Sequence, residues 1–352
     1  MGPDGGTGRC RKPAARFPFP STGTRSGDGG SGRSPESGST GAVGGVVDVV
    51  DNAIVVGVDG AEASERAALW AARQAAVFGE PLVLVHAVRW SMHTQAHLHA
   101  PVPLGAIHPG VGEEPVRQWA RDVLDGLAER CRAAAGVEVR TEVASGDPAD
   151  AVILGAERVA FVAVGHSERG GVARFLLGST AERLTRACPW PVVVVRDGVP
   201  LDGRHTGAPV VVGVDGTPVS GRAVRFAFGF AARHDAEVVV VHASSGEVTT
   251  EVEPVETHEE AALREGTGPV GTELVECARR HPAVRYRLVH AAAPPVDALL
   301  AASAGAGLLV VGSHGKGAVR RTLLGSVSHE VIDHAPCPVA VLPPRTADAR
   351  ER

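Results

Sequence analysis

The feature that most constrains how this chain can fold is an internal duplication. The segment VVGVDG at residues 55–60 recurs 156 residues later, at 211–216. Further along, FLLGS at 175–179 recurs 147 residues later, with one substitution, at 322–326. Because each copy has the length of an ordinary domain, the sequence predicts two equivalent domains rather than one large one.

The repeats also predict where the domains begin and end. We expect the first copy at 49–197 and the second copy at 208–345, with a polar, Gly/Pro-rich linker at 198–207. The preceding segment, residues 1–48, is rich in Gly, Ser, Pro and Arg and has few aliphatic side chains. Such a composition cannot bury enough apolar surface to offset chain entropy, so this tail is predicted to be disordered.

Each copy contains short runs of Val, Ile and Leu that lack polar alternation, as strands buried on both faces do. Longer segments with apolar residues at helical spacing separate these runs. The alternation of strands and helices predicts parallel pairing through right-handed crossovers, hence two Rossmann-like, doubly wound α/β domains. In the second copy we expect strands at 209–214, 237–242, 284–289, 307–312 and 338–342.

Two helix starts carry capping signals. Thr217 followed by Pro218 predicts an N-cap and a first-turn proline in the second copy. In the first copy, Ser179 and Glu182 have the spacing of a capping box, in which two side chains bond reciprocally to backbone N–H groups. We therefore expect a helix to begin at each of these places.

Composition and charge exclude several function classes. The net charge of −5 and the pI near 6.3 are unlike those of a nucleic-acid-binding protein, which carries a basic excess. No apolar stretch approaches the ~20 residues of a membrane span. The five cysteines form no CxxC pair and are odd in number, which fits reduced thiols better than disulfides or a zinc site. We therefore expect a cytoplasmic protein without nucleic-acid or membrane partners.

Ligands of doubly wound sheets bind beyond the carboxyl ends of the strands, so the residues that follow the predicted strands form the candidate site. Asp215 follows the first strand of the second copy, and His242-Ala243 follows the second strand. His242 and its equivalent His86 are expected to pack rather than to act as bases. After the fourth strand come Gly312-Ser313-His314-Gly315-Lys316-Gly317 and then Gly325-Ser326-Val327-Ser328, which open the last helix.

This glycine loop has the properties of an anion site. Glycine lets backbone amides approach an anion closely, and a helix N-terminus supplies unpaired N–H groups and roughly +0.5 charge. Lys316, Arg320 and Arg321 add cations in a chain whose net charge is negative. The spacing is neither that of a Walker A loop nor that of GxGxxG. The loop predicts phosphate binding, and the alternative is that its glycines only make tight turns in a packed α/β unit.

Gly312-x2-Gly315-x9-Gly325-Ser326, together with the opening VGVDG and closing APCPV segments, resembles the universal stress protein family in its tandem form. The resemblance covers both copies. It implies a five-stranded parallel sheet in each copy, pairing of the copies through their final strands, and binding of ATP or AMP. By similarity, Asp215 would lie at the ribose or phosphate side, and the backbone of Val241, His242 and Ala243 would face adenine. The phosphates would lie against Gly312, Gly315, Gly325, Ser326 and Ser328.

The first copy departs from this motif. It retains a weaker equivalent site, but Glu168 stands where the second copy has Gly315, and Ala181 where it has Ser328. If that glycine takes a positive φ, a side chain there costs roughly 1–2 kcal/mol, and a carboxylate beside a phosphate adds repulsion. We expect nucleotide to bind mainly to the second copy, unless Glu168 swings outward. The retained residues of the weaker site are Asp59, Gly165, Gly178 and Ser179.

The sequence therefore predicts a stress-response sensor or regulator that binds an adenine nucleotide and offers a nucleotide-dependent conformation to an unidentified regulatory protein. No catalytic residue stands out, so we expect a protein that is not an enzyme, with weak ATP hydrolysis at most. Two alternatives stay open: a slow Mg²⁺-dependent ATP hydrolase, with Asp215 as the candidate Mg²⁺ ligand, and an assembly scaffold that binds no nucleotide. A homodimer of two such chains is compatible with each of these schemes.

Overall fold

The computed structural model describes residues 52–89, 113–154, 159–166, 177–198, 207–243, 269–315 and 324–344. All of them belong to one compact unit, Gly44–Arg352. The predicted tail, most of the predicted linker, and Glu168, Lys316 and Gly317 lie outside these ranges. Within the ranges, no helix has both the length and the apolar character that crossing a bilayer requires.

Strands and helices alternate in both copies, as the apolar runs predict. The first copy contains β1 (Ala53–Gly57), α1 (Glu62–Phe78), β2 (Leu82–Val88), α2 (Glu113–Ala135), β3 (Val139–Ser145), α3 (Pro148–Leu154), β4 (Val159–His166), α4 (Ser179–Ala187) and β5 (Val192–Arg196). The second copy contains β6 (Val210–Val214), α5 (Pro218–His234), β7 (Val238–Ala243), α7 (Pro269–Arg280), β8 (Tyr286–Ala291), α8 (Pro295–Ala302), β9 (Leu308–Gly312), α9 (Ser326–His334) and β10 (Val339–Leu342). Each strand of the second copy begins and ends within two residues of its predicted bounds.

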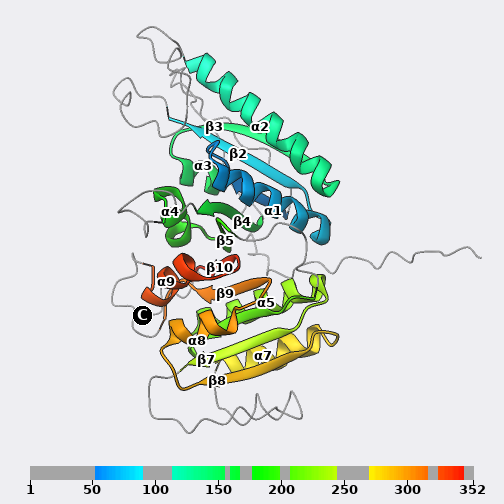
Figure 1. Ribbon diagram of the computed structural model, residues 1–352, viewed down its shortest axis with the longest axis vertical. Coiled ribbons are helices and arrows are strands. Elements are labelled where there is room, and N and C mark those ends of the chain that lie inside the picture. The colour runs from blue at the N-terminus through cyan, green and yellow to red at the C-terminus, as the bar shows by residue number, and fades with distance from the viewer. Residues whose placement is uncertain are drawn as a thin grey trace, which may run out of the picture. The chain divides into compact units, whose positions relative to one another are not determined.

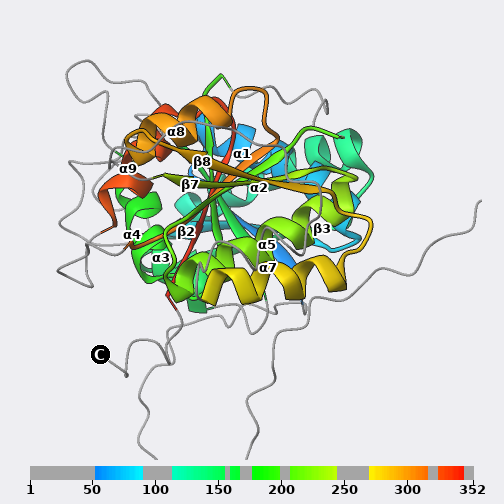
Figure 2. The same ribbon diagram turned by 90° about the horizontal axis from the view of Figure 1, so that it is seen from below.

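The strands form one sheet in the order β3-β2-β1-β4-β5-β10-β9-β6-β7-β8 (Figure 1). Neighbouring strands are parallel within each copy, whereas β5 and β10 pair antiparallel. Helices cover both faces: in the second copy, α5 and α7 lie on one side of the strands and α8 on the other (Figure 2). The predicted doubly wound α/β class is confirmed, and the final strands of the two copies pair as the resemblance implies.

An approximate twofold axis relates the two copies where their final strands meet. Val193 of β5 faces Ala340 of β10, and these two residues occupy equivalent positions of the repeat. The residues that pair at this junction are buried in both strands. The final strand of each copy is therefore used inside the chain, and a second chain cannot pair along it.

Helices α1 and α5 meet across the same axis. The ring centroids of Phe78 and Phe230 lie 5.7 Å apart, in tilted contact. The repeat equivalents of these two residues also touch, since the Nε2 atom of His234 lies 2.7 Å from Oε1 of Gln74 in a buried position. The two copies thus share a helix interface as well as a sheet.

The two predicted helix starts have different outcomes. Helix α5 begins at Pro218 with Thr217 as its N-cap, and the Thr217 hydroxyl accepts a hydrogen bond from the Ser220 N–H, as predicted. The capping box predicted at Ser179 is wrong: α4 begins at that residue with Gly178 as N-cap, and no described side chain caps the helix. A serine at the first helical position lies one residue too far along to bond reciprocally with a glutamate three residues later.

Candidate functional site

The carboxyl ends of β6, β7 and β9 meet at one edge of the second copy. Val214 of β6 pairs in register with His242 of β7, so Asp215 comes directly after that pair. Gly312 ends β9, the strand on the other side of β6. The fold therefore brings together the three strand ends that the sequence singles out.

The carboxylate of Asp215 is fixed in place by the first turn of α5. Its Oδ1 atom accepts hydrogen bonds from the Thr217 N–H at 3.0 Å, the Thr217 hydroxyl at 2.7 Å and the Ser220 hydroxyl at 2.5 Å. The Asp215 N–H in turn donates to Ser220 Oγ at 3.0 Å. With three donors on one oxygen, the half-buried side chain has a defined orientation.

The loop after β9 passes close to this carboxylate. A Cβ built on Gly315 would lie 3.0 Å from Asp215 Oδ2, and a Cβ on Gly312 would lie 2.8 Å from Cγ1 of Val219. Gly315 is not among the described residues with a positive φ; at this edge the left-handed glycine is Gly216, with φ 81°. The premise that Gly315 takes a positive φ is therefore wrong, and the close approach of the Asp215 carboxylate is what favours glycine there.

The N-terminus of α9 is held against the end of β9. The Ser328 hydroxyl donates a hydrogen bond to the Gly312 carbonyl oxygen at 2.6 Å, and the Gly325 N–H donates to the Ser313 carbonyl oxygen at 2.8 Å. The helix's own hydrogen bonds begin with His329 N–H to Gly325 O. Three amides precede that bond at the positive end of the helix dipole, those of Ser326, Val327 and Ser328.

These contacts divide the predicted phosphate-binding residues into two groups. The Gly325 N–H and the Ser328 hydroxyl are engaged within the protein, so they position the helix. Ser313 is fully buried, its N–H donates to the Leu342 carbonyl oxygen, and its Oγ lies 2.9 Å from His314 Nδ1. Among the residues that the structure describes at this edge, the amides of the first turn of α9 are the donors best placed for an anion.

His290 lies at this edge although the sequence analysis did not single it out. Its ring centroid is 5.5 Å from that of His242, and the two residues pair in register on β8 and β7. The strand predicted at 284–289 stopped one residue short of it. A signal was present, because the segment VHA that ends β7 also ends β8, at 289–291.

The weaker site predicted in the first copy is built differently. Asp59 is exposed, and although its Oδ1 accepts from the Ala61 N–H at 2.9 Å, the Ser64 hydroxyl donates to the Ala61 carbonyl oxygen rather than to the aspartate. A Cβ on Gly165 would lie 2.3 Å from the carbonyl atoms of Ala63, so β4 ends directly against the backbone of α1. Helix α4 opens with the same glycine–serine pair as α9, Gly178-Ser179.

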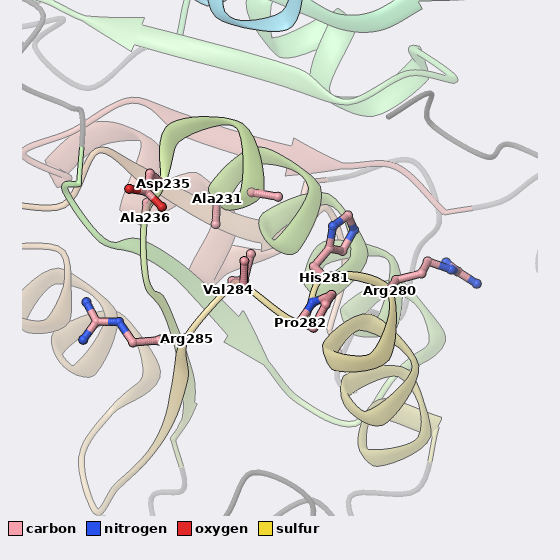
Figure 3. Close-up of a pocket in the computed structure, with 10 residues that line it drawn as sticks. Ala231, Asp235, Ala236, Arg280, His281, Pro282, Val284 and Arg285 are labelled. Atoms are coloured by element: carbon pink, nitrogen blue, oxygen red, sulfur yellow. The ribbon is translucent and has the colours of Figure 1, made fainter. Parts of the chain in front are cut away.

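A hollow of about 430 Å³ lies at the opposite edge of the second copy, on the loops that precede β7 and β8 (Figure 3). Asp235, Arg280, His281 and Arg285 contribute to its lining, and the two arginine side chains extend in opposite directions (Figure 3). Burial, followed by the charges of Arg280 and Arg233, lowers the pKa of His281. Because its polar groups do not converge, this hollow lacks the usual arrangement of a ligand site.

Fold and edge chemistry together define a class: tandem, doubly wound α/β proteins with a glycine loop and a helix N-terminus at the carboxyl edge of a parallel sheet. The model of the universal stress protein family matches residues 52–196 and 208–343. The chain belongs to the universal stress protein family.

Relatives match along nearly their whole length. A universal stress protein of Mycobacterium tuberculosis (strain H37Rv) is 35% identical over 292 residues, covering 82% of this chain and 96% of the relative. One from Mycolicibacterium smegmatis is 32% identical over 301 residues, covering 83% and 97%. The crystal structure of a universal stress protein from Archaeoglobus fulgidus covers 83% of this chain and 98% of its own, at 22% identity and a TM-score of 0.61, a likeness of fold.

Proposed function

We propose that this protein binds an adenine nucleotide, ATP or AMP, at the carboxyl edge of the second copy and acts as a stress-response sensor or regulator. The observation that carries the proposal is the cradle formed by Gly315 against Asp215 Oδ2 and by Gly312 against the Ser328 hydroxyl. A single Cβ at Gly315 would fill part of this space. Such close backbone approach suits a bound phosphate chain.

The chain's own groups fit the parts of a nucleotide. The amides at the start of α9 lie at the positive end of a helix dipole, where an anion is favoured by about 0.3–1 kcal/mol or more. Asp215 is fixed with one oxygen toward Gly315, and a carboxylate accepts hydrogen bonds from ribose hydroxyls. The resemblance assigns adenine to the backbone of Val241–Ala243, whose side of the site holds His242 and His290.

Asp215 supports binding better than metal-dependent turnover. Its Oδ1 atom accepts three hydrogen bonds from Thr217 and Ser220, so this oxygen is already part of a network within the protein. Mg²⁺ prefers six oxygen ligands and is commonly held by one or two carboxylates together with substrate phosphates. A Mg²⁺ ion that accompanied the nucleotide would therefore depend mainly on the phosphates. The proposal is a binding protein whose ligand shifts the conformation offered to a protein partner.

Calorimetric titration of the full-length protein with ATP, and separately with AMP, tests this proposal. We expect binding by the unsubstituted protein and roughly 100-fold weaker binding by Gly315→Glu, which places a carboxylate where the first copy has Glu168. Gly126→Ala is the matched control, because a Cβ at Gly126 in α2 meets nothing within 4 Å.

Two outcomes would change the conclusion. If mass spectrometry finds no adenine nucleotide released from the heat-denatured protein, and titration gives no heat, the nucleotide proposal fails. If the protein instead turns over ATP steadily with Mg²⁺, and Asp215→Ala abolishes that turnover, the ATP hydrolase is favoured.

A further inference from the structure

In the first copy, the indole of Trp119 lies across the carboxyl ends of β1 and β2. Two of its ring atoms, Cη2 and Cζ2, would be 3.5 and 3.7 Å from a Cβ built on Gly60, which follows Asp59. Its ring centroid is 5.6 Å from that of His86 in β2, at an interplanar angle of 80°. The indole therefore contacts both the residue after the strand-end aspartate and the end of the neighbouring strand.

The same two positions flank the proposed base site in the second copy. Gly60 and His86 correspond through the repeat to Gly216 and His242. In the second copy, the backbone of Val241–Ala243 at the end of β7 is where the proposal puts adenine. An indole is a fused aromatic bicycle of about the size and thickness of a purine. In the first copy, the side chain of Trp119 thus fills the corresponding place.

Burial at this strand end agrees with an occupied site. His86 is 8% exposed, whereas its equivalent His242 is only half-buried. Burial lowers the pKa of His86 below its usual value of 6.5. This effect outweighs a hydrogen bond with the backbone of Val58 and the charge of Asp59, both of which raise the pKa. Water is therefore largely excluded from the end of β2.

The two copies differ here in sequence as well as in structure. When the buried Leu124, Ala128 and Cys131 of α2 are aligned with the buried Val270, Leu274 and Cys277 of α7, Trp119 aligns with Glu265. Glu265 lies outside the described residues, and its side chain is not aromatic. The duplication therefore supplies an indole to one site only.

We propose that Trp119 occupies the base position of the first copy and closes that site to adenine nucleotides, so that each chain holds one nucleotide. The identity of the excluded ligand rests on the proposed function. The occlusion itself is a property of the first copy and is measurable without any nucleotide.

A histidine titration by NMR tests the occlusion directly. In the full-length protein, Trp119→Ala should raise the pKa of His86 toward 6.5, and Trp119→Phe should raise it less. His281 is the internal control, because its pKa is lowered by its own burial, Arg280 and Arg233 and should stay constant in both variants. An unchanged pKa of His86 in Trp119→Ala would overturn the proposal, provided the variant keeps its circular dichroism spectrum.

Nucleotide binding to the first copy is tested where the second site is disabled. In a Gly315→Glu, Glu168→Gly chain, adding Trp119→Ala should tighten ATP binding by ~10-fold or more. Equal affinity with and without Trp119 would refute its role as the obstruction, as would two bound nucleotides per unsubstituted chain. If the unsubstituted chain binds no nucleotide, the proposed function fails, while the His86 titration still decides whether Trp119 seals the strand end.

Discussion

In both copies the N–H of the strand-end aspartate donates a hydrogen bond to a serine at the same repeat position, but the two serine hydroxyls donate to different acceptors. Ser220 Oγ lies 2.5 Å from Asp215 Oδ1, whereas its equivalent Ser64 donates to the Ala61 carbonyl oxygen. Both serines are buried. A hydrogen bond to a charged group stabilises a protein more than one to a neutral group. The two hydroxyls should therefore contribute unequally to stability.

Replacement of each serine by alanine measures this difference. Ser220→Ala should lower the free energy of unfolding by about 1.5–3 kcal/mol, and Ser64→Ala by about 0.5–1.5 kcal/mol. Urea titration followed by circular dichroism at neutral pH provides both values, and Ser64→Ala serves as the matched control. Equal losses in the two variants would show that the bond to Asp215 carries no extra stabilisation.

At the scale of residues, the sequence predicted which side chains gather at the edge better than it predicted what they do. Asp215, Gly312 and Gly315 are together because parallel strands end at one edge. The reason for glycine at Gly315 depends on how near the Asp215 carboxylate comes, and no local pattern encodes that distance. Trp119 was missed for the same reason, since helical periodicity does not tell which strand end a side chain will cover.

The helices α1 and α5 end with the same geometry but different residues. Gly79 closes α1 with φ 68°, and its N–H bonds to the Ala75 carbonyl oxygen. Asp235 closes α5 with φ 52°, and its N–H bonds to the Ala231 carbonyl oxygen. A side chain in the left-handed region is strained, and a carboxylate at a helix C-terminus also opposes the dipole. The second copy therefore has the less favourable cap.

A reciprocal exchange of these caps tests the argument. Asp235→Gly should raise the free energy of unfolding by about 1 kcal/mol, and Gly79→Asp should lower it by a similar amount. Calorimetry of thermal unfolding measures the change in the free energy of unfolding for each variant. The two variants serve as controls for each other because their expected changes have opposite signs. Destabilisation by Asp235→Gly would mean that the greater backbone freedom of glycine in the unfolded chain outweighs the relief of strain.

At the scale of elements, the strands were predictable because burial on both faces leaves continuous apolar runs. The exact start of α4 was not predictable, because the residue types there fit either Ser179 or Gly178 as the N-cap. The structure has the earlier of the two starts, with Gly178 as N-cap and Ser179 as the first helical residue. The contacts of α1 with α5 could not be predicted either, because the sequence of each helix indicates an apolar face but not which element packs against it.

At the scale of the whole molecule, the described parts of the two copies are joined by the β5–β10 pair, by the α1–α5 contact and by His166 of β4 beside Asp333 of α9. Each contact is buried and connects residues far apart in the sequence. Unfolding of one copy would expose the final strand and one helix face of the other. The two copies should therefore lose structure together in a single transition.

Four buried cysteines report on this cooperativity. Burial raises the pKa of Cys131 and Cys188 in the first copy to about 11, and that of Cys277 and Cys337 in the second copy to about 12. At mildly alkaline pH they are protonated and unreactive in the folded protein.

In a Cys10→Ser background, we expect all four thiols to become reactive toward a disulfide reagent at the same urea concentration. Peptide mapping of the labelled sites assigns each reaction to its copy. Labelling of Cys131 and Cys188 well before the other two, or the reverse, would contradict a single transition.

In a homodimer with twofold symmetry, the two chains have the same residue at every equivalent position. A mutation therefore changes the interface at two places. Here both partners are encoded by one polypeptide, and that rule no longer applies. His166 lies 3.5 Å from Asp333, yet the counterparts of these residues are Ser313 and Arg186. Because both copies are encoded in one chain, a substitution in one copy leaves the other copy unchanged. The two copies can therefore diverge in sequence and in function.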